Sequence, residues 1–290
     1  EVRWNEPLSR HTTFRVGGMA RCLVRPDTEE ALIQVIGRAR GQGIPYVVLG
    51  GGSNVLVPDG GLNQLVIQLT QCCKEITRSD RQGELGVDVT VGGGARTRRL
   101  LRYCMEEGLS GLEFMVGIPG TVGGALVMNA GTGDGCLADV LCWIEVLDER
   151  GSRIRLDRKD LTPVYRSMGL SKGWIVMSGG FRLSFAQNGD LSRHMLSEKM
   201  RLRMRTQPVA LASAGCIFKN PPGFSAGFLI DRAGLKGFRV GDAEVSEKHA
   251  NWIVNRGNAR ARDILDLIEH IEKLVLEEFG VCLEREIQIL

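Results

Sequence analysis

Two glycine-rich segments contain the residues of this chain that are best suited to bind a ligand for chemistry. GGGSNVL covers positions 50–56 and GIPGTVGGALVMNAG covers 117–131, and both lie at the ends of predicted strands. Successive glycines can turn their backbone N–H groups into a concave nest for an anion, and they let a flat ring approach the backbone. Either segment alone is more often an ordinary turn. Together they favour a cofactor that contains a pyrophosphate.

Neither segment matches the common nucleotide-binding motifs. Val55 stands where the Rossmann fingerprint requires its third glycine, and no Gly-Lys-Ser/Thr follows that would make a P-loop. The sequence therefore predicts a dinucleotide held outside a Rossmann fold, and it argues against a Rossmann NAD dehydrogenase.

The composition narrows the class of protein. The 290 residues are enough for two or three compact domains, and the net charge of +3 gives no reason to expect a nucleic-acid partner. Eight cysteines and four histidines show no ligand spacing, so we expect free thiols and no metal site. No apolar run reaches the ~18 residues of a membrane span, and the N-terminus lacks the apolar core of a signal peptide. We therefore expect a cytoplasmic protein with no membrane partner.

The hydrophobic pattern predicts mixed helices and strands. Period-two alternation at 84–91 is typical of a half-buried strand, and an apolar stripe along 261–279 followed by Gly280 is typical of an amphipathic helix. Further helices are predicted at 28–41, 96–107 and 191–205. Further strands are predicted at 46–49, 55–57, 65–69, 143–148, 153–156, 174–184 and 281–290.

Eight segments in order resemble one enzyme family. They are TTFRVGG (12–18), GGGSNVL, GLEFMVGIPGTVGGALVMNAG (111–131), Tyr165-Arg166, SAGCIFKNP (213–221), AGFLIDRAGLKG (226–237), VSEKHANWIVN (245–255) and LEREIQIL (283–290). Together they resemble the UDP-N-acetylenolpyruvoylglucosamine reductases in their shorter subtype and cover nearly the whole chain. A single segment is weak support, but eight in register are specific.

The resemblance implies an α+β fold, with a two-lobed FAD-binding module of the PCMH type and a smaller α+β substrate-binding domain. The expected boundaries are 1–70 for the first lobe, joined by 283–290, then 71–190 for the second lobe and 191–282 for the substrate domain. It also implies non-covalent FAD, with NADPH as reductant. The residues that would line FAD are Arg15, Gly51, Gly52, Ser53, Asn54, Pro119, Gly120, Thr121, Gly123, Gly124, Asn129 and Gly131.

The implied reaction reduces an enol ether of a UDP-sugar. Hydride reaches the enolpyruvyl methylene carbon, and the negative charge that builds beside it needs stabilisation and then a proton. The resemblance assigns Arg166 and Glu286 to the charge, and Cys216 stands where the family usually has the serine that donates the proton. A thiol of ordinary pKa, ~8.5, is a better acid than an alcohol. Without the motifs, these residues would be interpreted as a packed cysteine, a surface arginine and a solvated strand glutamate.

Tyr165, Asn220 and His249 are the predicted substrate-pocket residues. The alternatives are a turn asparagine before Pro221 and a surface histidine. A basic run, Lys199 to Arg205, is interpreted as the solvated face of a helix rather than as a phosphate site. Gly133 stands where the family often has an aromatic residue or histidine, so a substrate contact at that position is not carried over.

Two other functions are compatible with the same fold. An oxidase of small alcohols that links its flavin through a histidine beside the glycine loop is disfavoured, because no histidine occurs between 12 and 193. A non-catalytic relative predicts loss of the acid, the arginine or the glutamate, yet all three positions hold competent groups. We expect a monomer that acts on the UDP-sugar enol ether and NADPH.

Overall fold

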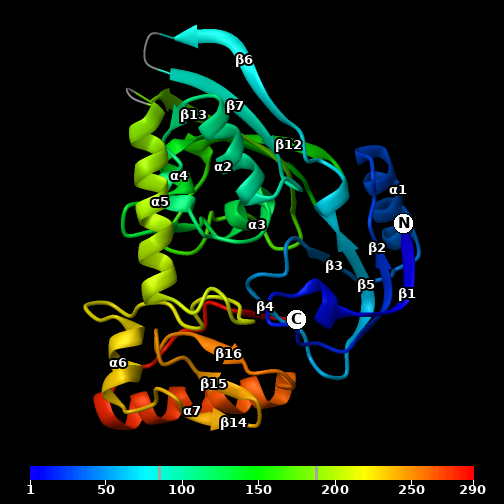
Figure 1. Cartoon of the computed structure of the whole chain (residues 1–290). Coiled ribbons are helices and arrows are strands. Elements are labelled where there is room, and N and C mark those ends of the chain that lie inside the picture. The colour runs from blue at the N-terminus through cyan, green and yellow to red at the C-terminus, as the bar shows by residue number, and fades with distance from the viewer. Residues whose placement is uncertain (84–85, 187–188) are drawn as a thin grey trace. The chain divides into compact units, whose positions relative to one another are not determined.

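The computed structural model describes residues 1–83, 86–186 and 189–290, and the chain divides into two compact units (Figure 1). The first unit contains Glu1–Arg3, Leu23–Gly51 and Gln64–Met200. The second contains Trp4–Cys22, Gly52–Asn63 and Arg201–Leu290. Each unit is therefore assembled from segments that are distant in the sequence.

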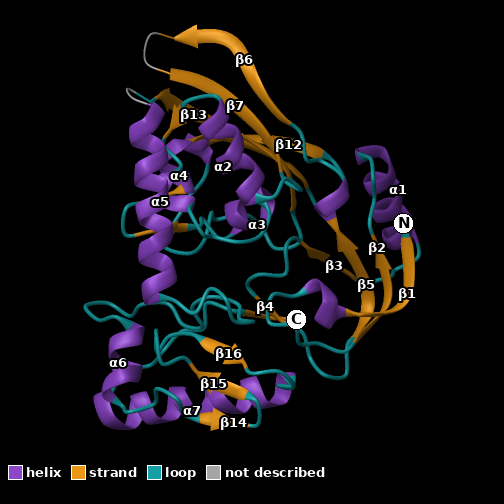
Figure 2. Ribbon diagram, in the orientation of Figure 1, coloured by secondary structure: helices purple, strands orange, loops and turns teal. Residues whose placement is uncertain are grey.

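The first unit is built on an antiparallel sheet in the order β12-β11-β13-β7-β6, with β8 (Leu109–Ser110) pairing β13 (Figure 2). Its strands are β6 (Ile76–Gly83), β7 (Gly86–Gly92), β11 (Leu141–Leu147), β12 (Arg153–Asp157) and β13 (Ile175–Phe185). Val87, Val89 and Val91 are fully buried. The strand predicted at 84–91 is thus confirmed from 86 onward, while Glu84 and Leu85 lie outside the described residues.

Helices pack on this sheet through their apolar stripes. α2 (Thr97–Glu106), α3 (Val122–Val127) and α4 (Leu137–Val140) bury Leu100, Leu126 and Leu137 in one core with the strand valines. The predicted helix 96–107 is confirmed. The predicted strands at 143–148, 153–156 and 174–184 are confirmed within one or two residues.

A second core in this unit lies under α1 (Glu29–Gly41). The Thr28 side chain accepts a hydrogen bond from Ala31 N at 3.1 Å and caps the helix, as its position before the apolar stripe predicted. Leu32 and Ile36 pack on Ile67, near the parallel pair β3 (Tyr46–Leu49) and β5 (Leu62–Gln68). β1 (Val2–Pro7), β2 (Met19–Val24) and β5 each include residues of both units.

The second unit packs α7 (Ala261–Phe279) and α6 (Ala226–Arg232) against the sheet β14-β15-β16 (Figure 1). Those strands are β14 (Arg239–Val240), β15 (Ala243–Val245) and β16 (Ile253–Asn255). Asp59 accepts hydrogen bonds from Ala261 N and Arg262 N at 2.8 and 2.9 Å, which satisfies the free donors at the start of α7. Gly280 ends the helix with φ 67°, so the predicted helix 261–279 is confirmed at both ends.

The prediction of a strand over 281–290 is wrong for most of its length. Only β17 (Gln288–Ile289) is a strand, and it pairs in parallel with β4 (Val55–Leu56). Val281, Leu283 and Ile287 still pack on the core of the second unit, but Ile289, assigned to the same face, is 42% exposed. Alternation predicts which side chains pack, whereas a strand also needs a partner for its backbone, and the pairing in this unit is confined to short stretches.

Three further elements complete the fold. α5 (Gly189–Thr206) includes the predicted helix 191–205, and the hairpin β9 (Gly131–Thr132) and β10 (Gly135–Cys136) follows the second glycine segment. Short 3-10 turns occur at Leu8–His11, Leu69–Gln71, Glu113–Met115 and Arg158–Asp160. Among the residues that the structure describes, no helix combines the length and apolarity needed to cross a membrane.

Candidate active site

The two predicted glycine segments meet in the first unit. A Cβ atom added to Gly51 would lie 2.5 Å from the Cα of Gly120, and one added to Gly50 would lie 2.5 Å from the Thr121 Oγ1. A side chain at Gly51 would therefore collide with the backbone of Gly120, and one at Gly50 would collide with the Thr121 side chain. We call this close approach of Gly50 and Gly51 to Gly120 and Thr121 the glycine cradle.

The second segment is held in place by its own backbone bonds. Gly123 N donates to Gly93 O and Val122 N donates to Ala95 O, both at 2.8 Å, and Thr97 N donates to Gly120 O at 3.2 Å. Gly124 N donates to the Thr121 side chain at 3.3 Å, which caps α3. The N–H groups of Gly123 and Gly124 are thus engaged within the protein. Gly123 and Gly124 could let a ligand approach the backbone closely, but their N–H groups already have partners in the protein.

Sequence reasoning missed a third glycine run and the arginine after it. Gly92, Gly93 and Gly94 form the surface to which the second segment is bonded, and the Arg96 Nη1 lies 3.1 Å from the Cβ position of Gly51. Partial burial and the charges of Arg98 and Arg25 lower the pKa of Arg96. The signal was available in the sequence, because three glycines stand two residues before Arg96, the residue that precedes α2.

Arg166 occupies a turn that is fastened to the second glycine segment. Ser167 N donates to Val164 O at 3.1 Å, and Arg166 itself has φ 61°, a left-handed conformation that usually requires glycine at that position of a turn. The Asn129 side chain donates to Val164 O at 3.2 Å, and the Arg166 Nη1 donates to Gly131 O at 3.0 Å. The guanidinium carbon lies 4.8 Å from the centre of the Tyr165 ring. The structure thus joins Asn129, Gly131, Tyr165 and Arg166, as expected of neighbours in one site.

The loop that contains Gly133 is linked to α5. The Asp134 carboxylate pairs with Lys199, and this partner lowers the pKa of the aspartate. The interpretation of Lys199 as part of a purely solvated helix face is therefore incomplete. A Cβ atom at Gly133 would meet no other atom within 4 Å, so packing does not explain the absence of a side chain there.

The turn that contains Arg15 is bonded to Gly52 in the second unit. Arg15 has φ 57° and its N–H donates to Thr12 O at 3.2 Å, while Thr13 N donates to Gly52 O at 2.9 Å. Gly52 has φ 64°, and a Cβ there would lie 1.9 Å from His11 O, so no other residue fits. The first motif of the resemblance is therefore bonded to the first glycine segment.

Asn54, Glu286 and Cys216 are also neighbours in this unit. The Asn54 Nδ2 donates to Glu286 O at 3.1 Å, and Gln288 N donates to Asn54 O at 3.0 Å. Glu286 N donates to Ile217 O at 2.7 Å, directly after Cys216. These bonds hold the backbone of Glu286 from both sides. Cys216, the predicted acid, and Glu286 thus lie on two backbone segments that are hydrogen-bonded to each other.

The other two predicted substrate residues have structural roles as well. The Asn220 Oδ1 accepts from Ala226 N at 3.0 Å, at the first residue of α6. The His249 Nδ1 accepts from Asn251 N at 3.3 Å, and burial lowers the pKa of the imidazole, so it is neutral at pH 7. A contact of either residue with substrate stays a prediction.

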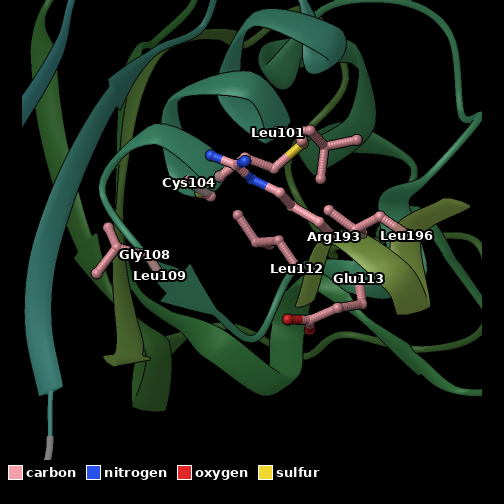
Figure 3. A pocket seen from close by; sticks show the side chains of 9 residues that line it. Leu101, Cys104, Gly108, Leu109, Leu112, Glu113, Arg193 and Leu196 are labelled. Atoms are coloured by element: carbon pink, nitrogen blue, oxygen red, sulfur yellow. The ribbon is translucent and has the colours of Figure 1, made fainter. Parts of the chain in front are cut away.

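A cavity of about 20 Å³ separates α2 from α5 and is lined by residues such as Leu101, Leu112 and Arg193 (Figure 3). That volume holds about one water molecule, so this cavity is a small packing defect and is too small for a cofactor. Within the described part of the chain, no three His, Cys, Asp or Glu residues gather in a way that could hold a metal.

Comparison with known proteins gives this geometry its context. Residues 207–290 match the family model described as UDP-N-acetylenolpyruvoylglucosamine reductase, C-terminal domain, and residues 20–157 match that of an FAD binding domain. The chain is 53% identical over 290 residues to the UDP-N-acetylenolpyruvoylglucosamine reductase of Syntrophobacter fumaroxidans, covering 100% of this chain and 84% of that protein. It belongs to the UDP-N-acetylenolpyruvoylglucosamine reductase family.

Two other relatives agree with this membership. The enzyme of the same name from Moorella thermoacetica is 43% identical, with 100% of this chain and 93% of that protein covered. The crystal structure of the reductase from Thermus caldophilus aligns with a TM-score of 0.81 at 39% identity, covering 100% of this chain and 98% of that chain. The resemblance drawn from the eight motifs is confirmed, and so is the predicted α+β fold with a PCMH-type FAD module and a smaller second domain. The chain is an FAD-dependent oxidoreductase.

Proposed function

We propose that this protein reduces UDP-N-acetylglucosamine enolpyruvate to UDP-N-acetylmuramate with NADPH, a step in making peptidoglycan precursors. The observation that carries the proposal is the cradle between Gly51 and Gly120, in a chain 53% identical to a reductase of that name. Bound FAD supplies the hydride chemistry between NADPH and the enol ether. The residues of the chain would bind the cofactor, orient the substrate and manage charge and protons.

Arg166 would stabilise the charge that spreads into the substrate carboxylate. A guanidinium stays protonated through the reaction and can fork onto a carboxylate. The bond to Gly131 O and the Tyr165 ring support this role, because they hold the side chain before substrate arrives. The left-handed backbone at Arg166 is a further sign, since such strain persists where the surroundings impose it and gathers at functional sites.

Glu286 would stabilise the enolate beside that carboxylate, and Cys216 would protonate the carbon. The two bonds that hold the Glu286 backbone support a fixed position for its side chain. A protonated carboxyl could donate a hydrogen bond to the developing charge. The neighbouring Cys216 would act as the general acid, because a protonated thiol can give its proton to the carbon.

The test is to follow the flavin spectrum of the purified, FAD-loaded protein in two steps without oxygen. NADPH should bleach the flavin band, and the UDP-sugar enol ether should restore it with UDP-N-acetylmuramate as product. An enol ether without the UDP group serves as the matched control. Bleaching by NADPH with no reoxidation by the UDP-sugar would refute the proposed substrate, and no bleaching would refute the proposed reductant.

We also infer a cytoplasmic monomer. Eight free cysteines agree with a reducing compartment. Sedimentation of the loaded protein at several concentrations tests the oligomeric state. A mass that doubles with concentration would refute the monomer.

A further inference from the structure

One arginine of the first unit reaches both glycine segments. Arg96 directly precedes α2, and its backbone pairs with Thr121 of the second segment in an isolated antiparallel bridge. Its side chain reaches the first segment, where the Nη1 lies 3.1 Å from the Cβ position of Gly51. All three residues belong to the first unit, and none of the roles described above uses Arg96.

The backbone beside Arg96 is fastened to the second glycine segment. Thr97 N donates to Gly120 O at 3.2 Å, and the Thr97 hydroxyl donates to Ile118 O at 2.7 Å. These bonds fix the point from which the Arg96 side chain extends. The position of the guanidinium against Gly51 therefore follows from the fold of the segment and not from a partner at the end of the side chain.

The Arg96 guanidinium lacks a counter-charge in the part of the chain that the structure describes, where none of its N–H groups has a hydrogen-bond or ion-pair partner. Partial burial lowers the pKa of Arg96, and the positive charges of Arg98 and Arg25 lower it further. The guanidinium stays protonated all the same, because its ordinary pKa is above ~12. An anion at this place would offset both the loss of hydration and the repulsion between the arginines.

The second glycine segment has few free donors for such an anion. The N–H groups of Val122, Gly123 and Gly124 already donate within the protein. A guanidinium makes paired, charge-assisted hydrogen bonds to phosphate oxygens, and these are stronger than bonds between neutral groups. Arg96 can therefore supply the charge and the donors that the backbone at 122–124 does not.

We propose that the Arg96 guanidinium binds a nucleotide diphosphate, and that the nucleotide is FAD. The match to the FAD binding domain covers residues 20–157 and so includes Gly51, Arg96 and Gly120, whereas the family's C-terminal domain begins at residue 207. The proposal rests on the proposed roles of Gly51 and Gly120 in lining FAD, and it does not depend on which substrate the enzyme reduces. NADPH and a UDP-sugar also contain a diphosphate, so the experiment must separate these three sources.

Chemical modification of the wild-type chain locates the contact. Phenylglyoxal reacts with accessible guanidinium groups, so Arg96 should be modified in the full chain freed of flavin and protected when FAD is bound, as measured by peptide mass spectrometry. Arg102, an exposed arginine of α2, is the matched control that should react equally in both states. NADP⁺ and UDP-N-acetylglucosamine should leave Arg96 reactive. Protection by either of them but not by FAD would overturn the assignment to FAD, and equal modification with all three would overturn the diphosphate contact.

Affinity measurements on variants test the charge itself. Arg96→Gln should raise the dissociation constant of FAD about tenfold or more, the usual worth of a hydrogen bond to a charged group. Arg96→Lys keeps the charge but cannot make the paired contact, so it should recover part of the affinity. Arg102→Gln should bind FAD as the wild type does. Flavin fluorescence titration gives all four constants without NADPH or the enol ether.

The failure of this inference and the failure of the proposed function give different results. An FAD affinity that is the same in Arg96→Gln and in the wild type would overturn the inference, even where NADPH and the UDP-sugar cycle the flavin. An equal loss in Arg96→Gln and Arg96→Lys would also overturn it, because the arginine would then only pack between the two segments. A flavin that the UDP-sugar does not reoxidise would refute the proposed substrate and leave the contact with FAD intact. The protection measurement on the wild type decides the matter if the variants do not fold.

Discussion

Replacing Asn129 by alanine should lower the free energy of unfolding by about 3 kcal/mol and should also impair substrate reduction. The buried Asn129 side chain accepts from Ala138 N at 3.0 Å and donates to Val164 O at 3.2 Å. It therefore joins the second glycine segment to the turn that contains Arg166. Alanine removes both bonds.

The magnitude follows from three contributions. Loss of the bond to Val164, whose residue is exposed, costs about 1 kcal/mol. The buried N–H of Ala138 is left without its partner, which costs about 1 kcal/mol or more. Asn129 has φ 41°, and a left-handed conformation costs alanine about 1 kcal/mol, while asparagine tolerates it through local hydrogen bonds.

Asn129→Asp is the matched control. A protonated carboxyl can accept from Ala138 N, donate to Val164 O and tolerate the left-handed backbone, so at a pH low enough to protonate it this variant should lose less stability than alanine does. Urea denaturation followed by tryptophan fluorescence at saturating FAD measures both changes. Since the Arg166 turn is released, reoxidation of the flavin by substrate should slow more than its reduction by NADPH in both variants. Equal stability of the two variants, or a loss well under 1 kcal/mol for alanine, would refute the reasoning.

Four further outcomes are expected. Acid precipitation should leave a colourless pellet and a yellow supernatant, because FAD is predicted to bind without a covalent link, and a yellow pellet would contradict this. Arg166→Ala and Glu286→Ala should slow the substrate half-reaction while flavin reduction by NADPH largely survives in stopped flow, and equal losses in both halves would point to a role in folding or NADPH binding. Cys216→Ala should slow single-turnover product formation about 10²-fold or more, Cys216→Ser should keep part of the rate, and the wild-type rate should fall as pH rises past the thiol pKa; a wild-type rate in Cys216→Ala would place the acid elsewhere. Two arginines, Arg256 foremost, lower the pKa of Glu244 below 4.5, so its contribution to stability is present above pH 4.5 and is lost as pH falls through the lowered value. Glu244→Gln should therefore flatten the acid side of the stability profile in urea titrations, and an unchanged profile would show that the pair contributes nothing.

The local sequence pattern was enough to predict elements whose backbone hydrogen bonds all lie within one segment. The helices at 29–41 and 261–279 were predicted from an apolar stripe and a terminal residue, because a helix forms its hydrogen bonds within one segment. The glycine segments were predictable as places of close backbone approach, since such approach demands glycine wherever it occurs. The order of the eight motifs also indicated the family, and the family resemblance indicated the candidate site residues.

Only the tertiary structure decided the features that need a hydrogen-bond or packing partner from a distant segment of the chain. The C-terminal segment has the alternation of a strand, yet only Gln288–Ile289 pairs, because pairing depends on where Val55 and Leu56 lie. The part that Gly93 plays as a support also depends on a distant partner, because its carbonyl accepts from Gly123 N. The same holds for Asn129, whose partners are 9 and 35 positions away in the sequence. A sequence shows which groups can donate, accept or pack, but the chain must fold before any of them has a neighbour, since hydrogen bonds and close contacts act over a few ångströms.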